Sequence, residues 1–128
     1  MRVFELRISV FAWWLLCFAL LPVAAGDPPT SRRVYFIGNS VTDTIKYDGL
    51  EQLAAERGRQ LTWGRHMIPG APLQWIWSHP EDGFHQAPFG RYPAALAGHS
   101  WDVLCLQPFD RHIDGQEGDV AMARNFVR

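Results

Sequence analysis

Three strand-like segments, each followed by a turn and a helical pattern, constrain the fold of this chain more than any other feature. Val34–Ile37 and Trp101–Leu106 are short, mostly apolar runs, and Gln60–Ile68 alternates imperfectly between polar and apolar residues. Helical patterns cover Ile45–Arg57, Pro72–Trp77, Tyr92–Ala97 and Asp119–Arg128. Because strands that alternate with helices form parallel sheets with right-handed crossovers, the sequence predicts an α/β fold. Three strands are about half of a typical doubly wound sheet, so we expect an incomplete one.

The segments between these elements complete the predicted organisation. Residues 27–33 form a polar linker that Pro28 and Pro29 keep extended. In the first helical pattern Ile45, Leu50 and Leu53 fall near one face, which predicts that this face packs on the sheet. Residues 78–90 are rich in Pro, Gly and His and are predicted to form a loop.

The N-terminus has the pattern of a secretory signal peptide. Arg2 and Arg7 precede an uncharged stretch from Ile8 to Leu21, and Pro22 and small residues follow. We expect residues 1–26 to be removed, by cleavage after Ala25 or Gly26. The alternative is an uncleaved anchor, because a spanning helix needs roughly 17–25 apolar residues. Both interpretations export the remaining chain, so the predicted location is secreted or periplasmic, with no stable membrane span after cleavage.

The composition of the predicted mature chain narrows its class. Without residues 1–26 the chain has 102 residues, with 10 basic and 12 acidic side chains, giving a formal net charge of −2. This length permits one small domain, and the charge does not favour a nucleic-acid partner. Cys105 is the only cysteine left, so no intrachain disulfide is expected, and its apolar surroundings predict an inert core residue.

The segment Gly38-Asn39-Ser40 breaks the first apolar run and places a serine at the carboxyl end of a strand. Open α/β sheets bind ligands at this edge. A serine hydroxyl attacks a carbonyl only when a base removes its proton, and backbone N–H groups of such a turn can hold the resulting oxyanion. The competing interpretation is that Ser40 or Thr42 caps the following helix.

The order strand, Gly38-Asn39-Ser40-x-Thr42, helix resembles the first sequence block of the SGNH (GDSL-type) hydrolases, in which Gly-Asp-Ser is usual. Here Asn39 replaces the aspartate. The resemblance implies a flavodoxin-like, three-layer parallel sheet and hydrolysis of an acyl ester, on a carbohydrate or lipid, without a cofactor. It also implies that Ser40 is the nucleophile and that its N–H contributes to an oxyanion hole.

Two further positions match the family's blocks less closely. Gly70 lies after the second strand, where the resemblance implies a second oxyanion donor; a plain Pro-Gly turn is the alternative. After the third strand the family has Gly-x-Asn-Asp, whereas this chain has Gln107-Pro108-Phe109-Asp110. Gln107 carries a side-chain amide and is the candidate for the third donor. Its alternative role is that of a polar residue ending a strand.

The block Asp-x-x-His, which supplies the base in the family, is not found in this sequence. Five histidines are present, and none has the family spacing: His66, His79, His85, His99 and His112. The resemblance covers residues 34 to about 112, so we expect a hydrolase that lacks its C-terminal third and is inactive as this fragment. A non-catalytic carbohydrate-binding or structural module of the same fold is the alternative.

A short cluster of metal-binding residue types lies within the predicted loop. It consists of His79, Glu81, Asp82 and His85. The spacing suits a divalent ion, but the Pro and Gly content favours an ordinary surface turn, so no metal is expected.

Aromatic residues are frequent after Gly70. They are Trp75, Trp77, Phe84, Phe89 and Tyr92. Exposed, they would line a sugar- or acyl-binding wall beside Ser40. Large aromatic side chains are mostly buried, so we expect most of them in the core.

Overall fold

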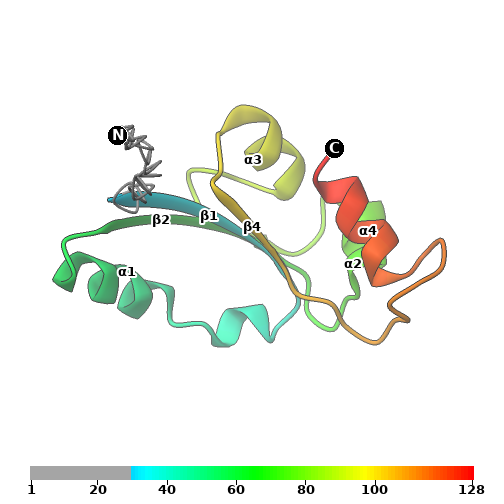
Figure 1. Ribbon diagram of the computed structural model, residues 1–128. Helices are drawn as coiled ribbons and strands as arrows, with labels where there is room; N and C mark the ends of the chain where they lie inside the picture. The colour runs from blue at the N-terminus through cyan, green and yellow to red at the C-terminus, as the bar shows by residue number, and fades with distance from the viewer. Residues whose placement is uncertain (1–29) are drawn as a thin grey trace, which may run out of the picture.

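The computed structural model describes residues 30–128 and shows a four-stranded sheet with helices on both faces (Figure 1). The strands are β1 (Ser31–Gly38), β2 (Gln60–Met67), β3 (Phe84–His85) and β4 (Val103–Leu106), in the order β3-β2-β1-β4. β1 is parallel to β2 and to β4, whereas β3 is antiparallel to β2. The α/β class predicted from the sequence is confirmed, with a mixed and mostly parallel sheet.

β1 is the middle one of the three parallel strands and begins earlier than predicted. It pairs with β2 along its whole length, from Ser31 opposite Gln60 to Gly38 opposite Met67. On its other side, Val34–Ile37 pairs with β4. The last three residues of the predicted linker therefore lie in the strand, because pairing with β2 supplies partners for their backbone groups.

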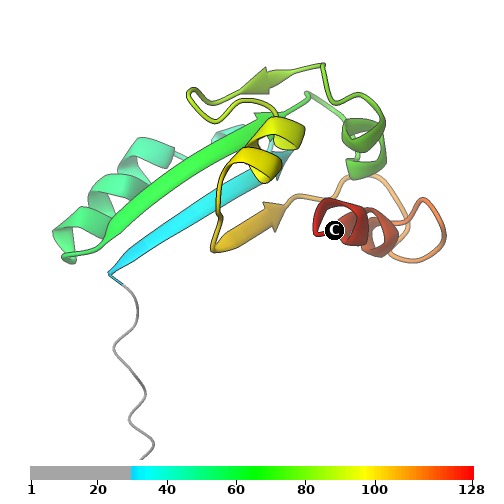
Figure 2. The ribbon, with the colours of Figure 1, turned by 90° about the horizontal axis from the view of Figure 1, so that it is seen from above.

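The helices form two layers around the sheet (Figures 1 and 2). The short 3-10 helix η1 (Thr42–Thr44) and α1 (Tyr47–Glu56) lie on one face. On the other face are α2 (Leu73–Ser78), α3 (Tyr92–Gly98) and α4 (Asp119–Phe126). α2 and α4 lie side by side near the carboxyl ends of the parallel strands (Figure 2).

The main core lies between β1 and the layer of α2, α3 and α4. Tyr35 and Ile37 are fully buried there, packed in one cluster with Ile76, Ala95 and Phe126. Alternation along the strand directs Phe36 to the opposite face, where its ring meets that of Tyr47 at 5.1 Å. Full burial of a side chain such as Ile76 contributes about 1.5–3 kcal/mol.

The prediction of which α1 residues pack on the sheet is wrong. The helix begins at Tyr47 rather than Ile45, and Tyr47 is its buried residue. Leu50 and Leu53 are exposed. The Tyr47 ring stacks on Trp63 of β2 at 4.3 Å. This large aromatic pair fills the space between helix and sheet, so the smaller aliphatic side chains remain at the rim.

The predicted burial of the aromatic residues is correct for Tyr92 and wrong for Trp75, Trp77 and Phe84, which are exposed. α2 has only six residues and turns one narrow face, Leu73 and Ile76, to the core. The two tryptophans therefore lie off that face. Phe84 belongs to β3, a strand inside the predicted loop, and both residues of this edge strand are exposed.

The predicted signal peptide, residues 1–26, lies outside the described residues. Within residues 30–128, no helix is long and apolar enough to cross a membrane.

Candidate active site

The carboxyl ends of β1 and of the edge strand β4 lie next to each other in the sheet. From β1 the chain continues to η1 and α1 on one face, and from β4 it continues to α4 on the other (Figure 1). Such a divergence opens a crevice at the strand ends, which is where open α/β sheets bind ligands. Ser40 follows β1 and Gln107 follows β4, so both predicted site residues lie at this crevice.

Asn39 is the buried anchor of the turn after β1, with 1% of its surface exposed. Its backbone N–H donates to Gln107 Oε1 at 3.0 Å, and its Oδ1 accepts from the Val41 N–H at 2.9 Å. Its Nδ2 donates to the Ala71 carbonyl at 3.5 Å. The Asn39 side chain thus joins the segments that follow β1 and β2, and its backbone N–H adds the segment that follows β4.

The loop after β2 holds Gly70 in a left-handed conformation, with φ at +66°. A glycine adopts this conformation without the strain that other residues meet. The Ala71 N–H donates to the Ile68 carbonyl at 3.2 Å and closes the turn. Asn39 bonds to Ala71. Ser40 is the chain neighbour of the first residue and Gly70 is the chain neighbour of the second. The structure therefore brings these two predicted site residues to one place.

Ser40 is exposed at the start of the turn that follows β1. Among residues 30–128, no group accepts a hydrogen bond from its N–H or from the Gly70 N–H, and its hydroxyl has no partner. Its carbonyl accepts from the Asp43 N–H at 3.2 Å. Neither η1 nor α1 has a side-chain cap, so the helix-cap interpretation of Ser40 and Thr42 is wrong.

The side-chain amide of Gln107 is hydrogen-bonded to the turn after β1 and to its own loop, so it is not free. The Gln107 backbone N–H donates to the Ile37 carbonyl at 2.9 Å, which extends the β1–β4 pairing. Its Oε1 accepts from the Asn39 N–H and lies 3.5 Å from Thr42 Oγ1. Its Nε2 donates to the Pro108 carbonyl. These contacts give Gln107 a positioning role, and its role as an oxyanion donor stays a prediction.

Gly38 allows this close packing. A Cβ atom at this position would collide with Thr42 Oγ1 and would lie 2.8 Å from Gln107 Cβ. Such distances are too short for carbon atoms, so the glycine is needed for the approach of the two segments. This requirement was not visible in the sequence, where Gly38 only marked the end of the first apolar run.

The histidines of residues 30–128 make no hydrogen bond to Ser40. His66 is fully buried: its Nε2 lies 2.7 Å from the Asp82 carbonyl, and its Nδ1 accepts from the Tyr92 N–H at 3.3 Å. Burial lowers the pKa of His66, and both of its partners suit a neutral ring. His79 stacks on Trp75 at 3.8 Å. The described residues therefore do not supply Ser40 with a base.

One serine–histidine contact was missed by the sequence analysis. Ser78 Oγ lies 3.0 Å from His79 Nδ1 at the C-terminal end of α2. The same hydroxyl lies within hydrogen-bond distance of the Gln74 and Trp75 carbonyls, at 3.0 and 3.1 Å. A helix C-terminus presents carbonyl groups and a negative partial charge, which disfavours an oxyanion. This pair is therefore a poor catalytic site compared with the Ser40 turn.

No group of three or more histidine, cysteine or acidic side chains converges on a point among residues 30–128. The candidate cluster of His79, Glu81, Asp82 and His85 is therefore not assembled as a metal site.

Comparison with known protein families, curated proteins and solved structures finds no match to this chain.

Proposed function

We propose that this chain carries the nucleophile half of a serine-dependent ester hydrolase of the SGNH type. The observation that supports this most directly is the arrangement around Ser40. Ser40 is exposed beside a strand end, and the two unused N–H groups belong to Ser40 and Gly70, the chain neighbours of the bonded residues Asn39 and Ala71. Backbone N–H groups with no protein partner are the donors that an oxyanion hole requires.

The sheet order supports the same proposal. β2-β1-β4 is the order in which the first three parallel strands of a flavodoxin-like sheet lie, with β4 as the third of them. Each of the three positions taken from the resemblance follows one of these strands: Ser40 after β1, Gly70 after β2 and Gln107 after β4. We infer the flavodoxin-like class from this order and this placement.

In the proposed reaction, Ser40 Oγ attacks the ester carbonyl carbon while a base takes its proton. The N–H groups of Ser40 and Gly70 hold the tetrahedral oxyanion, and Gln107 and Asn39 fix the turn that carries Ser40. The alcohol then leaves with a proton, and water hydrolyses the acyl-serine to release the acid. The base comes from polypeptide other than residues 30–128, because no histidine described there contacts Ser40.

The test supplies the missing base as imidazole in solution. The chain is incubated with 4-nitrophenyl butanoate in imidazole buffers, and Ser40→Ala under the same buffers corrects for direct hydrolysis by imidazole. We expect an excess rate in the wild-type chain that rises with imidazole concentration. Equal rates in the two proteins at every concentration would contradict the proposal.

A second candidate is a carbohydrate-binding module that performs no reaction. The observation in its favour is that no histidine among residues 30–128 bonds to Ser40. This candidate predicts that Ser40 stays unmodified by a fluorophosphonate even with imidazole present.

A further inference from the structure

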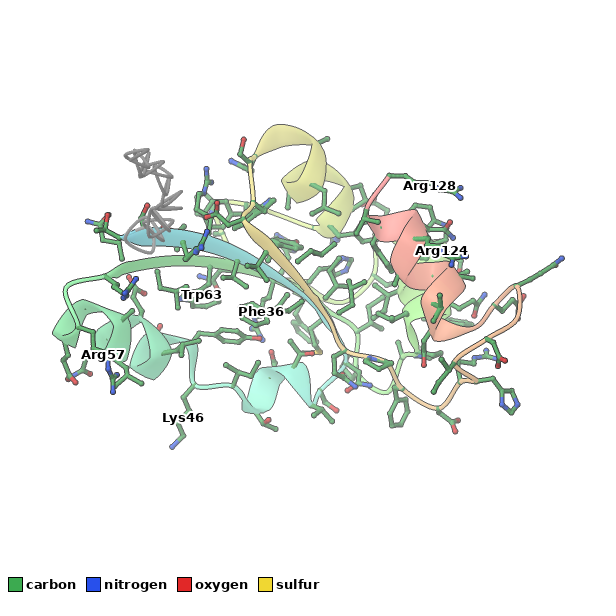
Figure 3. All side chains as sticks on the ribbon, viewed as in Figure 1. Phe36, Lys46, Arg57, Trp63, Arg124 and Arg128 are labelled. Atoms are coloured by element: carbon green, nitrogen blue, oxygen red, sulfur yellow. The ribbon has the colours of Figure 1, made fainter. Side chains whose placement is uncertain are left out.

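An apolar hollow of about 300 Å3 opens beside the Ser40 turn. This volume is at the low end of the roughly 300–1,000 Å3 of small-molecule sites. Its walls come from Val41 and Ile45 on one side and from Cys105 and Leu106 of β4 on the other. Phe36 lines it from β1, on the face of the sheet that looks toward η1 (Figure 3).

The hollow adjoins the candidate site at two points. Val41 and Thr42, which line it, directly follow Ser40 in the chain. Gln107 also lines it, and the same side chain accepts the Asn39 N–H at 3.0 Å. The hollow therefore begins one residue after Ser40 in the chain and shares Gln107 with the turn that carries Ser40.

The lining of the hollow favours a hydrocarbon ligand. It contains no acidic or basic side chain. Its polar groups already bond within the protein, since the Thr44 hydroxyl donates to the Val41 carbonyl at 2.7 Å and Thr42 lies against Gln107. Val41 is 53% and Ile45 36% exposed, so a ligand would remove apolar surface from water, which is favourable.

A larger hollow has different chemistry and a different place. It measures about 540 Å3 and lies between α1 and β2. Asp43, Asp48 and Arg65 line it, and Asp43 forms an ion pair with Arg65. These charged groups disfavour a hydrocarbon, so the hollow at β1 and β4 is the better site for one.

We propose that the hollow at β1 and β4 binds the acyl chain of the ester, as a short unbranched hydrocarbon chain. This identity of the ligand rests on the proposed function of Ser40. Binding of the chain itself requires no reaction and is measurable without that serine.

Cys105 is half-buried and not the core residue that its apolar surroundings predicted. It provides a reporter, because it lines the hollow and has a free thiol. The test uses the Ser40→Ala protein and measures alkylation of Cys105 by iodoacetamide, located by peptide mass spectrometry. Acetamide, butanamide and hexanamide are added as non-hydrolysable acyl probes. We expect protection that strengthens along this series, by about fourfold in affinity for each methylene that is buried.

Two exposed valines give a matched pair of variants. Val41→Phe places a larger ring in the hollow, whereas Val120→Phe makes the same change in α4, away from it. We expect hexanamide to protect Cys105 at least tenfold less well in Val41→Phe and equally well in Val120→Phe. Equal protection in both variants, or no protection by hexanamide in the parent protein, would overturn the proposal.

Two other outcomes separate the possible failures. If Cys105 is unreactive without any amide and sedimentation shows a dimer, a second copy fills the hollow and the proposal is overturned. If hexanamide protects Cys105 but Ser40 forms no fluorophosphonate adduct, the hydrocarbon site stands. The proposed function is then overturned, and with it the ester as ligand.

Discussion

The Asn39 backbone N–H and the Gln107 side chain, 68 residues apart in the sequence, form a hydrogen bond of 3.0 Å between the ends of β1 and β4. This bond fixes the turn that presents Ser40. It also gives Gln107 a role as acceptor, whereas the family resemblance implied a donor.

Substitution of Gln107 separates these two roles. Gln107→Ala removes the acceptor and leaves the Asn39 N–H without a partner, which costs about 1–3 kcal/mol. Gln107→Glu keeps an acceptor oxygen, so we expect it to retain more of the free energy of unfolding and of the Ser40 reactivity than Gln107→Ala. Urea denaturation and imidazole-dependent ester hydrolysis measure the two effects. A fully stable Gln107→Glu with no Ser40 reactivity would support the donor role instead.

Asn39→Asp tests the other part of the anchor. Aspartate keeps the oxygen that accepts from Val41, but its second oxygen replaces the donor to the Ala71 carbonyl. A carboxylate oxygen then faces the Ala71 carbonyl oxygen in a buried position, and we expect the free energy of unfolding to fall by about 1–3 kcal/mol at pH 7. The loss should shrink as the pH falls and the carboxyl gains a proton, because the protonated acid donates again.

Asn125→Asp in α4 is the control for this variant, since Asn125 Nδ2 has only a weak contact with Met122 sulfur at 3.9 Å. Urea denaturation at pH 5 and pH 7 makes the comparison. Equal losses in the free energy of unfolding for the two variants at both pH values would contradict the anchoring role of the Asn39 side chain.

Gly38→Ala tests the close approach of the turn to Gln107. The added methyl group collides with Thr42 and Gln107, and overpacking of this kind costs about 1–3 kcal/mol. Gly98→Ala in α3 is the matched control, because a Cβ there meets nothing within 4 Å. Thermal unfolding should show a lower midpoint for the first variant and an unchanged or slightly higher one for the second. The reverse order would contradict the packing described for Gly38.

The three parallel strands and the class of fold were predictable from two short apolar runs, which are typical of strands buried in a parallel sheet, and from the imperfect alternation of residues 60–68. The packing of α1 was not, since the sequence pattern does not reveal that Tyr47 and Trp63 fill the interface. β3 was missed because a two-residue edge strand has no periodicity to detect.

The candidate site was predictable in part. Ser40 and Gly70 were identified from their neighbours in the sequence, and the fold brings them together. The role of Asn39 was missed, because its partners Ala71 and Gln107 come from distant segments. The sequence showed Asn39 only as a departure from the usual aspartate, and the two hydrogen bonds of its side chain, one donated and one accepted, explain why an amide suits this position.

The buried His66 makes stability depend on pH. Desolvation lowers its pKa in the folded protein, so the unfolded chain binds a proton more readily. The contribution of His66 is therefore complete above the unfolded pKa of about 6.5 and is lost as the pH falls toward the folded value. We expect the free energy of unfolding to rise between pH 5 and pH 7.

His66→Gln should flatten this rise. Urea denaturation at intervals of half a pH unit gives the slopes. A slope for His66→Gln equal to that of the wild type would contradict the assignment.

The most direct test of the proposed function is the reaction of Ser40 with a fluorophosphonate. The chain is incubated with the probe at increasing imidazole concentrations, and peptide mass spectrometry locates the adduct. We predict one adduct, at Ser40, whose formation rate rises with imidazole and which is absent from Ser40→Ala. Ser78, which contacts His79 at a helix C-terminus, serves as the internal comparison and should stay unmodified. An unmodified Ser40, or labelling of Ser78 at the same rate, would contradict the account.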